Sequence, residues 1–357
     1  MRKKVLVAMS GGVDSSVSAL LLKEQGYRVT GVTMCLGPAG PVDSQKTKCR
    51  GKTAIEDAKK VCSRLEIPHY VLDFSKDIEK EVISDFVSEY SKGRTPNPCV
   101  RCNQYLKFGK LLSYAKKMGF DFLSTGHYAK IAKKQKEFFL TRPKDRKRDQ
   151  TYFLYRVSKD DLKFILFPLS EYTKEEVRKI AKNVSLPVAK KPQSQDICFV
   201  SKGRCKEFVS ERIKKRISGD IVDKDNNILG KHRGVFNYTI GQRGGLGVSF
   251  NRPLYVVDLD GRKNRVVVGG KEDLKSKNLA VSNLNRLSGS LSGNLSAKIR
   301  YAHKPASCKI IEEKGKVSVL FDEPQESITP GQSIVFYDND IVLGGGIIEK
   351  FDDEYKR

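Results

Sequence analysis

A short apolar run near the start of the chain, KKVLVAM at residues 3–9, passes directly into the glycine-rich segment SGGVDSS at residues 10–16. The run is typical of a buried parallel strand because it is short and rich in valine. A helix is expected from Ser15 to about Gln25, closed by Gly26. A strand that turns tightly into a helix predicts a parallel α/β fold, and no other feature constrains the first part of the chain as strongly.

The alternation of strand and helix continues along the chain. Further strands are expected at residues 27–34, 69–74 and 121–129, and further helices at residues 53–65, 76–91 and 104–118. This pattern predicts a parallel sheet covered by helices on both faces. Ligands of such sheets bind at the carboxyl ends of the strands, where the strand order reverses.

The pattern changes after about residue 205. A basic helix at residues 206–217 precedes short strands and turns, with a hairpin expected around Asp260-Gly261. The charge-dense segment 133–150 is expected to form a loop or a hairpin. We therefore predict an α/β domain at residues 1–205, a small central domain at residues 206–275 and a β-barrel or sandwich at residues 276–357.

The charge balance points to the class of partner. The 357 residues include 67 lysines and arginines against 42 aspartates and glutamates, a net charge of +25. This excess favours a polyanion such as nucleic acid, although a generally basic protein would show it too. The sequence has no run of 18 apolar residues and its first apolar stretch is too short for a signal peptide. We therefore expect no membrane span, a cytoplasmic location and cysteines that are thiols.

The glycine-rich segment is suited to bind phosphate. Its glycines allow close backbone approach, and free amides at the helix start lie beside the hydroxyls of Ser10, Ser15 and Ser16. The segment has neither the Gly-Lys-Ser/Thr of a Walker A loop nor the GxGxxG of a dinucleotide site. An ordinary strand-to-helix turn is the alternative.

SGGVDSS resembles the pyrophosphate loop of the N-type ATP pyrophosphatases, which adenylylate a substrate and release pyrophosphate. The resemblance implies an ATP site formed by Ala8, Met9, Ser10, Gly11, Gly12, Val13, Asp14 and Ser15, with adenine contacts near Met34 and Gly126. The last two positions end the second and fourth expected strands, in agreement with the topology. The resemblance also gives Asp14 a weaker role in holding Mg²⁺ near the phosphates.

Two cysteine segments are candidates for chemistry. In TPNPCVRCN, at residues 95–103, a double-proline turn leads into a helix and puts Cys102 near its N-terminus, next to an arginine. Both features are expected to stabilise a thiolate. Cys198, in SQDICFV, is the second candidate thiol. Cys62, in a helical apolar repeat, and Cys308, in a strand-like stretch, are expected to be structural.

Metal binding is an alternative role for these thiols. Cys99 and Cys102 form a CxxC pair, but a closed zinc site needs four ligands and the sequence has no second pair. Together with Cys198 they would make a three-cysteine site with one open position, which suits an iron–sulfur cluster.

Eight motifs resemble, in order, those of bacterial tRNA-specific 2-thiouridylases: SGGVDSSV, TPNPCVRCNQYLKFG, GHYA, DQTYFLY, SQDICFV, YTIGQRGGLG, RYAHKP and TPGQ. The match covers nearly the whole chain, and SQDICFV with TIGQRGGLG is far more specific than the phosphate loop. The resemblance implies an N-terminal ATP domain, a small central domain and a C-terminal β-barrel, which agrees with the division predicted above.

The resemblance also implies a reaction. ATP adenylylates the 2-oxygen of the wobble uridine in tRNAs for Lys, Glu and Gln. Cys198 carries a persulfide from a cysteine desulfurase or a relay protein, its terminal sulfur displaces AMP, and Cys102 closes the step by forming a disulfide with Cys198. Many members have Asp where this sequence has Cys99. The acid/base role of that carboxylate is then lost or moved, and the iron–sulfur alternative is strengthened.

The same resemblance implies contacts with tRNA. Asn97, Pro98 and Cys99 would face the target base, and His127 would contact the tRNA. Further contacts would come from Arg148, Asp149 and Gln150 at the anticodon stem, and from Arg300, Tyr301 and Gln332 of the barrel. A base must leave the anticodon stack before an enzyme can modify it.

Overall fold

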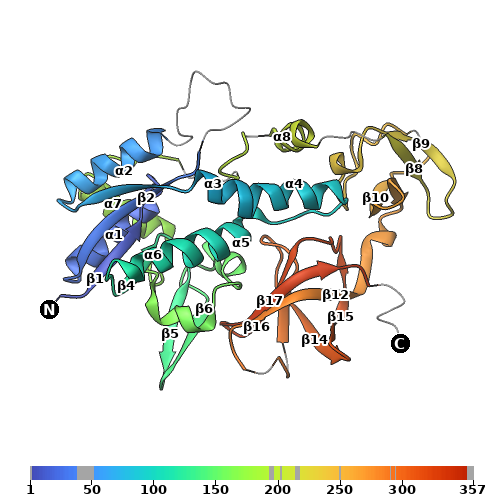
Figure 1. The fold of residues 1–357 in the computed structure, drawn as a ribbon. Helices are drawn as coiled ribbons and strands as arrows, with labels where there is room; N and C mark the ends of the chain where they lie inside the picture. Colours follow the sequence, from blue (N-terminus) through green and yellow to red (C-terminus); the bar gives the residue numbers. More distant parts are fainter. Residues whose placement is uncertain are drawn as a thin grey trace. The chain divides into compact units, whose positions relative to one another are not determined.

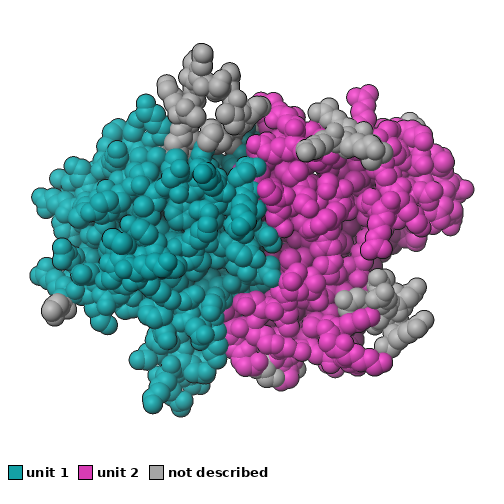
Figure 2. Space-filling view, viewed as in Figure 1, with its two compact units in different colours: residues 1–82, 99–201, 340–342 teal, residues 83–98, 202–339, 343–357 magenta. Residues whose placement is uncertain are grey.

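The computed structural model describes residues 2–37, 52–192, 197–201, 203–213, 218–248, 251–289, 291–293 and 295–351. The chain forms two compact units (Figure 2). The first unit contains residues 1–82, 99–201 and 340–342, and the second contains residues 83–98, 202–339 and 343–357. Each is described below by itself. None of the helices described is long and apolar enough to cross a membrane.

The first unit contains the predicted parallel sheet (Figure 1). Its strands are β1 (Lys4–Ala8), β2 (Arg28–Cys35), β3 (His69–Asp73), β4 (Phe122–Thr125) and β7 (Ile165–Leu166). The order is β3-β2-β1-β4-β7, and every pair is parallel. The order reverses between β1 and β4, and ligand sites of parallel sheets lie at the carboxyl ends of such strands.

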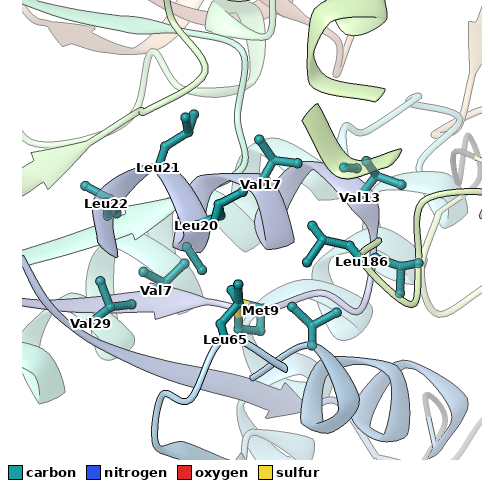
Figure 3. Packing of buried hydrophobic residues seen from close by; sticks show 14 of the residues in the cluster. Val7, Met9, Val13, Val17, Leu20, Leu21, Leu22, Val29, Leu65 and Leu186 are labelled. Atoms are coloured by element: carbon teal, nitrogen blue, oxygen red, sulfur yellow. The ribbon is translucent and has the colours of Figure 1, made fainter. Parts of the chain in front are cut away.

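Helices cover the sheet of the first unit. They are α1 (Val13–Glu24), α2 (Lys52–Arg64), α3 (Ser75–Ile78), α5 (Pro98–Arg101), α6 (Leu112–Lys117) and α7 (Lys174–Asn183). Alternate β1 residues Val5 and Val7, with Met9, pack with residues of α1, α2 and α7 in one buried cluster (Figure 3). Because side chains alternate along a strand, Leu6 points to the opposite face. This cluster fixes the start of α1 against the sheet.

The structure corrects the expected helix at residues 104–118. It begins earlier, at Pro98, and runs through α5 into a ten-residue π-helix, η2 (Cys102–Leu111), and then into α6. The expected helix at residues 76–91 is also interrupted, by a π-helix at Glu79–Ile83 between α3 and α4 (Ser84–Ser91). Periodicity does not reveal such insertions, because a π-turn keeps the helix continuous while shifting its buried face.

The charge-dense segment partly forms the expected hairpin. Strands β5 (Lys130–Lys134) and β6 (Glu137–Thr141) pair antiparallel, and a 3₁₀ turn at Arg146–Arg148 follows. Ile341, at the start of β17, pairs with Thr141.

The second unit has two sheets. In the first, β10 (Tyr255–Asp260), β11 (Arg265–Gly269), β8 (Gly219–Val222) and β9 (Ile228–His232) are adjacent in that order. The pair β10–β11 is the hairpin expected around Asp260-Gly261. Its buried cluster includes Ile221, Val256 and Val266. The predicted basic helix is present as α8, Cys205–Arg212, within the part of the chain that is described.

The second sheet closes into a barrel. Its strands are β12 (Lys275–Arg286), β13 (Leu295–Lys298), β14 (Ala306–Glu313), β15 (Lys316–Glu326), β16 (Ser333–Asp338) and β17 (Ile341–Glu349). Neighbours follow the order β12-β15-β14-β13-β16-β17, and β12 also pairs with β17. The barrel alternative of the prediction is therefore the one adopted, and closure leaves no free edge.

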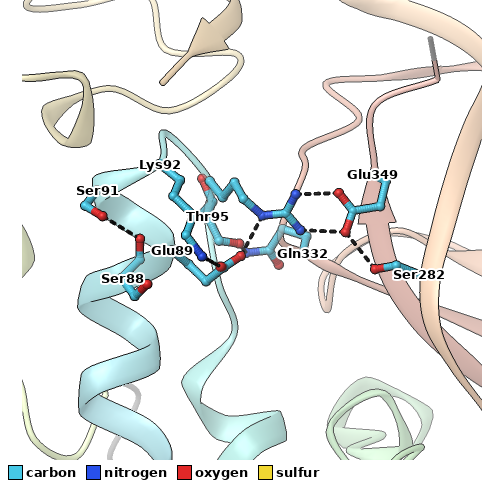
Figure 4. Close-up of polar contacts among 9 residues, drawn as sticks. Ser88, Glu89, Ser91, Lys92, Thr95, Ser282, Gln332 and Glu349 are labelled. Carbon is cyan, nitrogen blue, oxygen red and sulfur yellow. Dashed lines mark hydrogen bonds and ion pairs between the residues drawn. The ribbon is translucent and has the colours of Figure 1, made fainter. Parts of the chain in front are cut away.

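The segment at residues 83–98 belongs to the second unit, where α4 packs beside α8. Arg94 donates two hydrogen bonds to the carboxylate of Glu349 on β17 and a third to Glu89 (Figure 4). Thr95 donates its N–H to the Pro330 carbonyl, 3.0 Å away, and accepts from the Gln332 side chain at 2.9 Å. These bonds fix the chain just before the Asn97–Cys99 turn.

Candidate active site

The phosphate loop connects β1 to α1 at the carboxyl edge of the sheet. Gly12 precedes the helix, and α1 has no side-chain cap among the residues described. No side chain therefore occupies its first amides, which is the arrangement that anion sites at helix starts use, and the phosphate site stays a prediction. Met9 is 2% exposed, and its backbone N–H and carbonyl both bond to β2, through Val32 and Thr33. Met9 therefore anchors the start of the loop to β2 through its backbone, with its side chain buried.

The loop hydroxyls bond mainly within the loop. Ser10 N–H donates to the Ser15 hydroxyl at 3.1 Å, and Ser15 in turn donates to the Gly12 carbonyl at 3.2 Å. Ser16 is fully buried and donates to the same carbonyl at 2.8 Å. The expectation that all three hydroxyls face a phosphate is therefore wrong for Ser16, whose burial leaves it no route to a ligand.

Two glycines allow close packing around the loop. Gly11 has φ +68°, and a Cβ there would lie 2.3 Å from the Ala54 carbonyl oxygen of α2. Gly126 follows β4, and a Cβ there would lie 2.6 Å from the Ser15 nitrogen. Met34 is at the end of β2. Gly126 and Met34 therefore lie at the sheet edge that was expected to receive the adenine.

Two lysines that the sequence did not single out bond to the loop. Lys174, at the start of α7 and 5% exposed, bonds through Nζ to Asp14 Oδ1 at 2.5 Å. Tyr128 donates to the same oxygen at 3.0 Å. Lys191 bonds to the Gly11 carbonyl at 2.9 Å and to Asp57 at 2.6 Å. Asp14 therefore neutralises a buried ammonium group, and any Mg²⁺ that it binds would compete with Lys174.

The two candidate thiols come together in the first unit, with Cys99 beside them. Cys99 and Cys198 are exposed, Cys102 is half-buried and all three are free thiols. Although Cys198 keeps an exposed surface, the protein around its thiol removes water, and this desolvation together with the charges of Cys102 and Cys99 raises the pKa of Cys198 to about 12. The pKa of Cys99 is raised by burial and by the charge of Cys102. Ionisation of Cys102 therefore disfavours ionisation of both Cys99 and Cys198.

The expected activation of Cys102 is corrected. The helix dipole acts mainly within the first turn of a helix. This helix begins at Pro98, so the Cys102 thiol lies beyond that turn. Arg101 turns away: it donates to the Glu81 carbonyl at 3.1 Å, and its guanidinium lies 5.0 Å from the centre of the Tyr105 ring. Burial raises the pKa of Cys102, and the cation that lowers it is Lys107.

The described residues give no support to a metal site at the three cysteines. Among the residues described, no three or more His, Cys, Asp or Glu side chains are arranged to hold a metal ion. Cys99, Cys102 and Cys198 therefore do not fit as ready ligands of an iron–sulfur cluster. Cys62 and Cys308 are buried, as predicted, and burial raises their pKa values to about 11 and about 12. Cys35 is disulfide-bonded, so the expectation that every cysteine is a thiol is wrong.

Comparison with known proteins places these features in a family. Family models match three successive segments: a tRNA methyl transferase HUP domain at residues 3–202, a tRNA methyl transferase PRC-barrel domain at residues 206–270 and an aminomethyltransferase β-barrel domain at residues 276–348. The tRNA-specific 2-thiouridylase MnmA 1 of Syntrophus aciditrophicus is 51% identical over 350 residues, 98% of this chain and 94% of that protein. The chain belongs to the tRNA-specific 2-thiouridylase family.

Other relatives agree. The tRNA-specific 2-thiouridylases MnmA of Clostridium botulinum strain Alaska E43 and of Acetivibrio thermocellus are each 48% identical, over 98% of this chain and 98% and 99% of their own. A solved 4-thiouridine synthetase bound to RNA and ATP is 16% identical and covers 58% of this chain and 50% of its own, with a TM-score of 0.36. That TM-score is too low to support a conclusion.

Most tRNA-contact candidates of the first unit are used internally. Asp149 is 7% exposed and accepts from the Thr151 N–H and hydroxyl at 2.9 and 2.6 Å. Gln150 accepts from the Tyr128 N–H at 2.9 Å. His127 is 9% exposed, with its Nδ1 2.6 Å from the Thr125 hydroxyl. Arg148 is partly exposed. Asp149 and Gln150 therefore stabilise the local fold through these hydrogen bonds, independently of any contact with tRNA.

The candidates of the second unit differ among themselves. Tyr301 is 37% exposed, and the Lys298 ammonium lies 5.5 Å from its ring centre, which makes a charged stacking surface. Arg300 donates to the Glu326 carbonyl at 3.0 Å. Gln332 is bonded to Thr95, as described above, so its nearest task is to hold the turn. Asn97 is partly exposed, whereas Pro98 is buried.

Sequence reasoning missed three lysines. Lys174 and Lys191 carried no signal in a chain with so many basic residues. Lys107 did carry a sequence signal, because it lies five residues after Cys102 in the motif TPNPCVRCNQYLKFG. Residues 193–196, which precede Cys198 in SQDICFV, lie outside the described residues.

Proposed function

We propose that Cys102 and Cys198 perform the sulfur chemistry of an ATP-dependent 2-thiolation of tRNA. The chain is a tRNA sulfurtransferase by its family. One observation supports the residue assignment: two free thiols from separate segments of the first unit lie close enough that the charge of Cys102 acts on Cys198. A reaction that moves one sulfur atom and then closes a disulfide needs two such thiols.

The first step activates the base. ATP binds along the loop, its phosphates meeting the first amides of α1. Lys174 and Lys191 flank the loop, paired with Asp14 and Asp57, and a polyphosphate that replaced these carboxylates would gain both positive charges. The 2-oxygen of the wobble uridine, in tRNAs for Lys, Glu and Gln, attacks the α-phosphorus and pyrophosphate leaves. Asp14 is the carboxylate of the loop that would hold a Mg²⁺ ion, exchanging its bond to Lys174 for the metal, and the bound ion would supply screening of the phosphate charge.

The second step transfers sulfur. The terminal sulfur of a Cys198 persulfide attacks C2 of the adenylylated uridine. The C2–O bond breaks, and AMP leaves with the oxygen and the electron pair of that bond. The Cys102 thiolate then attacks Cys198 Sγ. The S–S bond to the base breaks with its electron pair going to the 2-thiouridine, and a Cys102–Cys198 disulfide forms. A dithiol reductant must reduce that disulfide before the next turnover.

The persulfide sulfur comes from a cysteine desulfurase, directly or through a relay protein, and a cytoplasmic location suits both partners. The tRNA contacts at Asn97, Pro98, Cys99, His127, Arg148, Asp149, Gln150, Arg300, Tyr301 and Gln332 remain predictions. Tyr301 is the best supported, because its exposed ring suits a single-stranded base.

The test is a thiolation assay with ATP, tRNA, a desulfurase and cysteine. Cys198→Ser and Cys102→Ser are each expected to abolish 2-thiouridine while pyrophosphate release persists, because activation precedes sulfur attack. AMP release should be lost in Cys198→Ser, because in this scheme the Cys198 persulfide displaces AMP. Cys205→Ser is the matched control, since Cys205 is a free thiol of the second unit. Near-normal thiolation by either active-site variant would refute the scheme. Activity that requires bound iron in anaerobic enzyme would instead favour the cluster alternative.

A further inference from the structure

Lys107 is held at the thiol cluster by a fixed chain of polar groups. It lies on the π-helix η2, and its Nζ is 3.5 Å from His127 Nε2. The other ring nitrogen, His127 Nδ1, is 2.6 Å from the hydroxyl of Thr125, the last residue of β4. Because an ammonium can only donate, His127 accepts at Nε2 and carries its proton on Nδ1. The rings of Phe108 and Phe167 flank the imidazole, each with its centre 6.0 Å away.

The imidazole in this chain is neutral. Burial lowers the pKa of His127 well below its ordinary value, and the charge of Lys107 lowers it further. A neutral acceptor fixes the ammonium without adding a competing positive charge. Of Lys107, His127 and Thr125, only Lys107 is charged, so this group of residues has one positive charge.

Lys107 lies about one π-turn from Cys102 on η2, since residues five apart are hydrogen-bonded neighbours in a π-helix, and its charge acts on all three thiols. The charge of Lys107 lowers the pKa of Cys99, of Cys102 and of Cys198, against the effect of burial. It is the side-chain cation common to the three among the residues described. Arg101, the sequence neighbour expected to do this, is bonded elsewhere.

We propose that Lys107 is the positioning residue of the sulfur-transfer step, its ammonium held by His127 so that it stabilises the sulfur anion on whichever of Cys198 and Cys102 carries it. The proposal rests on the proposed function. It explains how one fixed charge serves both half-steps. The persulfide anion of Cys198 and the thiolate of Cys102 exist in turn, so a cation facing both needs no movement between them.

The test measures thiol reactivity in the free enzyme, without ATP or tRNA. Alkylation by iodoacetamide, a neutral reagent, is followed at each cysteine by mass spectrometry from pH 6 to 10. In Lys107→Met the alkylation rates of Cys102 and Cys198, compared at each pH below the pKa of the thiol, are expected to fall about tenfold, which corresponds to a rise of about 1 unit in pKa. Cys205, whose pKa does not depend on Lys107, is the internal reference.

Two further variants make the test specific. Lys110→Met removes a charge from the same helix, but Lys110 is paired with Asp77, so the alkylation rates should not change. Lys107→Gln keeps an N–H donor for His127 while removing the charge, and should reproduce the slower alkylation even if the methionine variant folds poorly. Wild-type alkylation rates at Cys102 and Cys198 in folded Lys107→Gln would overturn the proposal. Weaker tRNA binding with wild-type alkylation rates would make Lys107 a phosphate contact instead. Because turnover is not used, failure of the two-thiol scheme would be seen separately.

Discussion

Replacing Arg94 by methionine should destabilise the second unit and slow thiolation. The guanidinium forms a bidentate pair with Glu349 and bonds to Glu89 at 2.5 Å (Figure 4). The Arg94 and Glu349 side chains are only 22% and 26% exposed. The substitution leaves Glu349 with the Ser282 hydroxyl, 2.6 Å away, as its remaining polar partner among those described here.

The magnitude follows from this burial. Removing one partner of a fully buried pair costs about 3–5 kcal/mol, and an exposed pair is worth about 0–1 kcal/mol. For a pair three-quarters buried we expect a loss of about 2 kcal/mol in the free energy of unfolding. A double-mutant cycle with Glu349→Gln should give a coupling energy of about 1–2 kcal/mol. Urea unfolding of the four proteins measures both quantities.

A matched control uses the same acceptor. Lys92 bonds to Glu89 at 2.9 Å but is 59% exposed, so Lys92→Met should cost less than about 0.5 kcal/mol. Arg94 also positions the chain before the Asn97–Cys99 turn. Arg94→Met should therefore lower kcat for thiolation while KM for ATP stays unchanged. An unfolding free energy equal to that of the wild type, or a change confined to KM for ATP, would refute the reasoning.

Two other predictions concern the first unit. Gly11→Ala should destabilise the loop and weaken ATP binding at least tenfold, because φ +68° and the Ala54 carbonyl oxygen exclude a Cβ. Gly12→Ala is its control: the nearest atom to a Cβ there is Ser10 Oγ at 3.4 Å, so equal losses in equilibrium ATP titrations would contradict this account. Burial lowers the pKa of His127, so below about pH 6.5 this histidine binds a proton in the unfolded chain but stays neutral in the folded protein. The free energy of unfolding therefore decreases as the pH is lowered below 6.5, by up to about 1.4 kcal/mol per pH unit, and His127→Asn should reduce this pH dependence. If urea unfolding between pH 6.5 and 5 gave the variant the same slope as the wild type, His127 would be protonated in the folded protein.

The sequence by itself determined the order of elements and the class of chemistry. The valine-rich strand followed by SGGVDSS required a loop at the start of a helix, because only glycine accepts φ +68° against a neighbouring backbone. Period-two patterns in the last third of the chain predicted strands, and the motifs carried the family. These signals are local, so they can be read without knowing what lies nearby in space.

Only the tertiary structure decided which charges act at the site. Arg101 adjoins Cys102 in sequence but bonds to Glu81, whereas Lys107 is brought to the thiols by a π-helix and held by His127. Lys174 reaches Asp14 from 160 residues away. A lysine looks the same in sequence whether it is solvated or buried, and its effect on a thiol depends on distance and burial. Those are set by packing, which is why the thiols and the loop were evident in the sequence and the lysines that lie beside them were not.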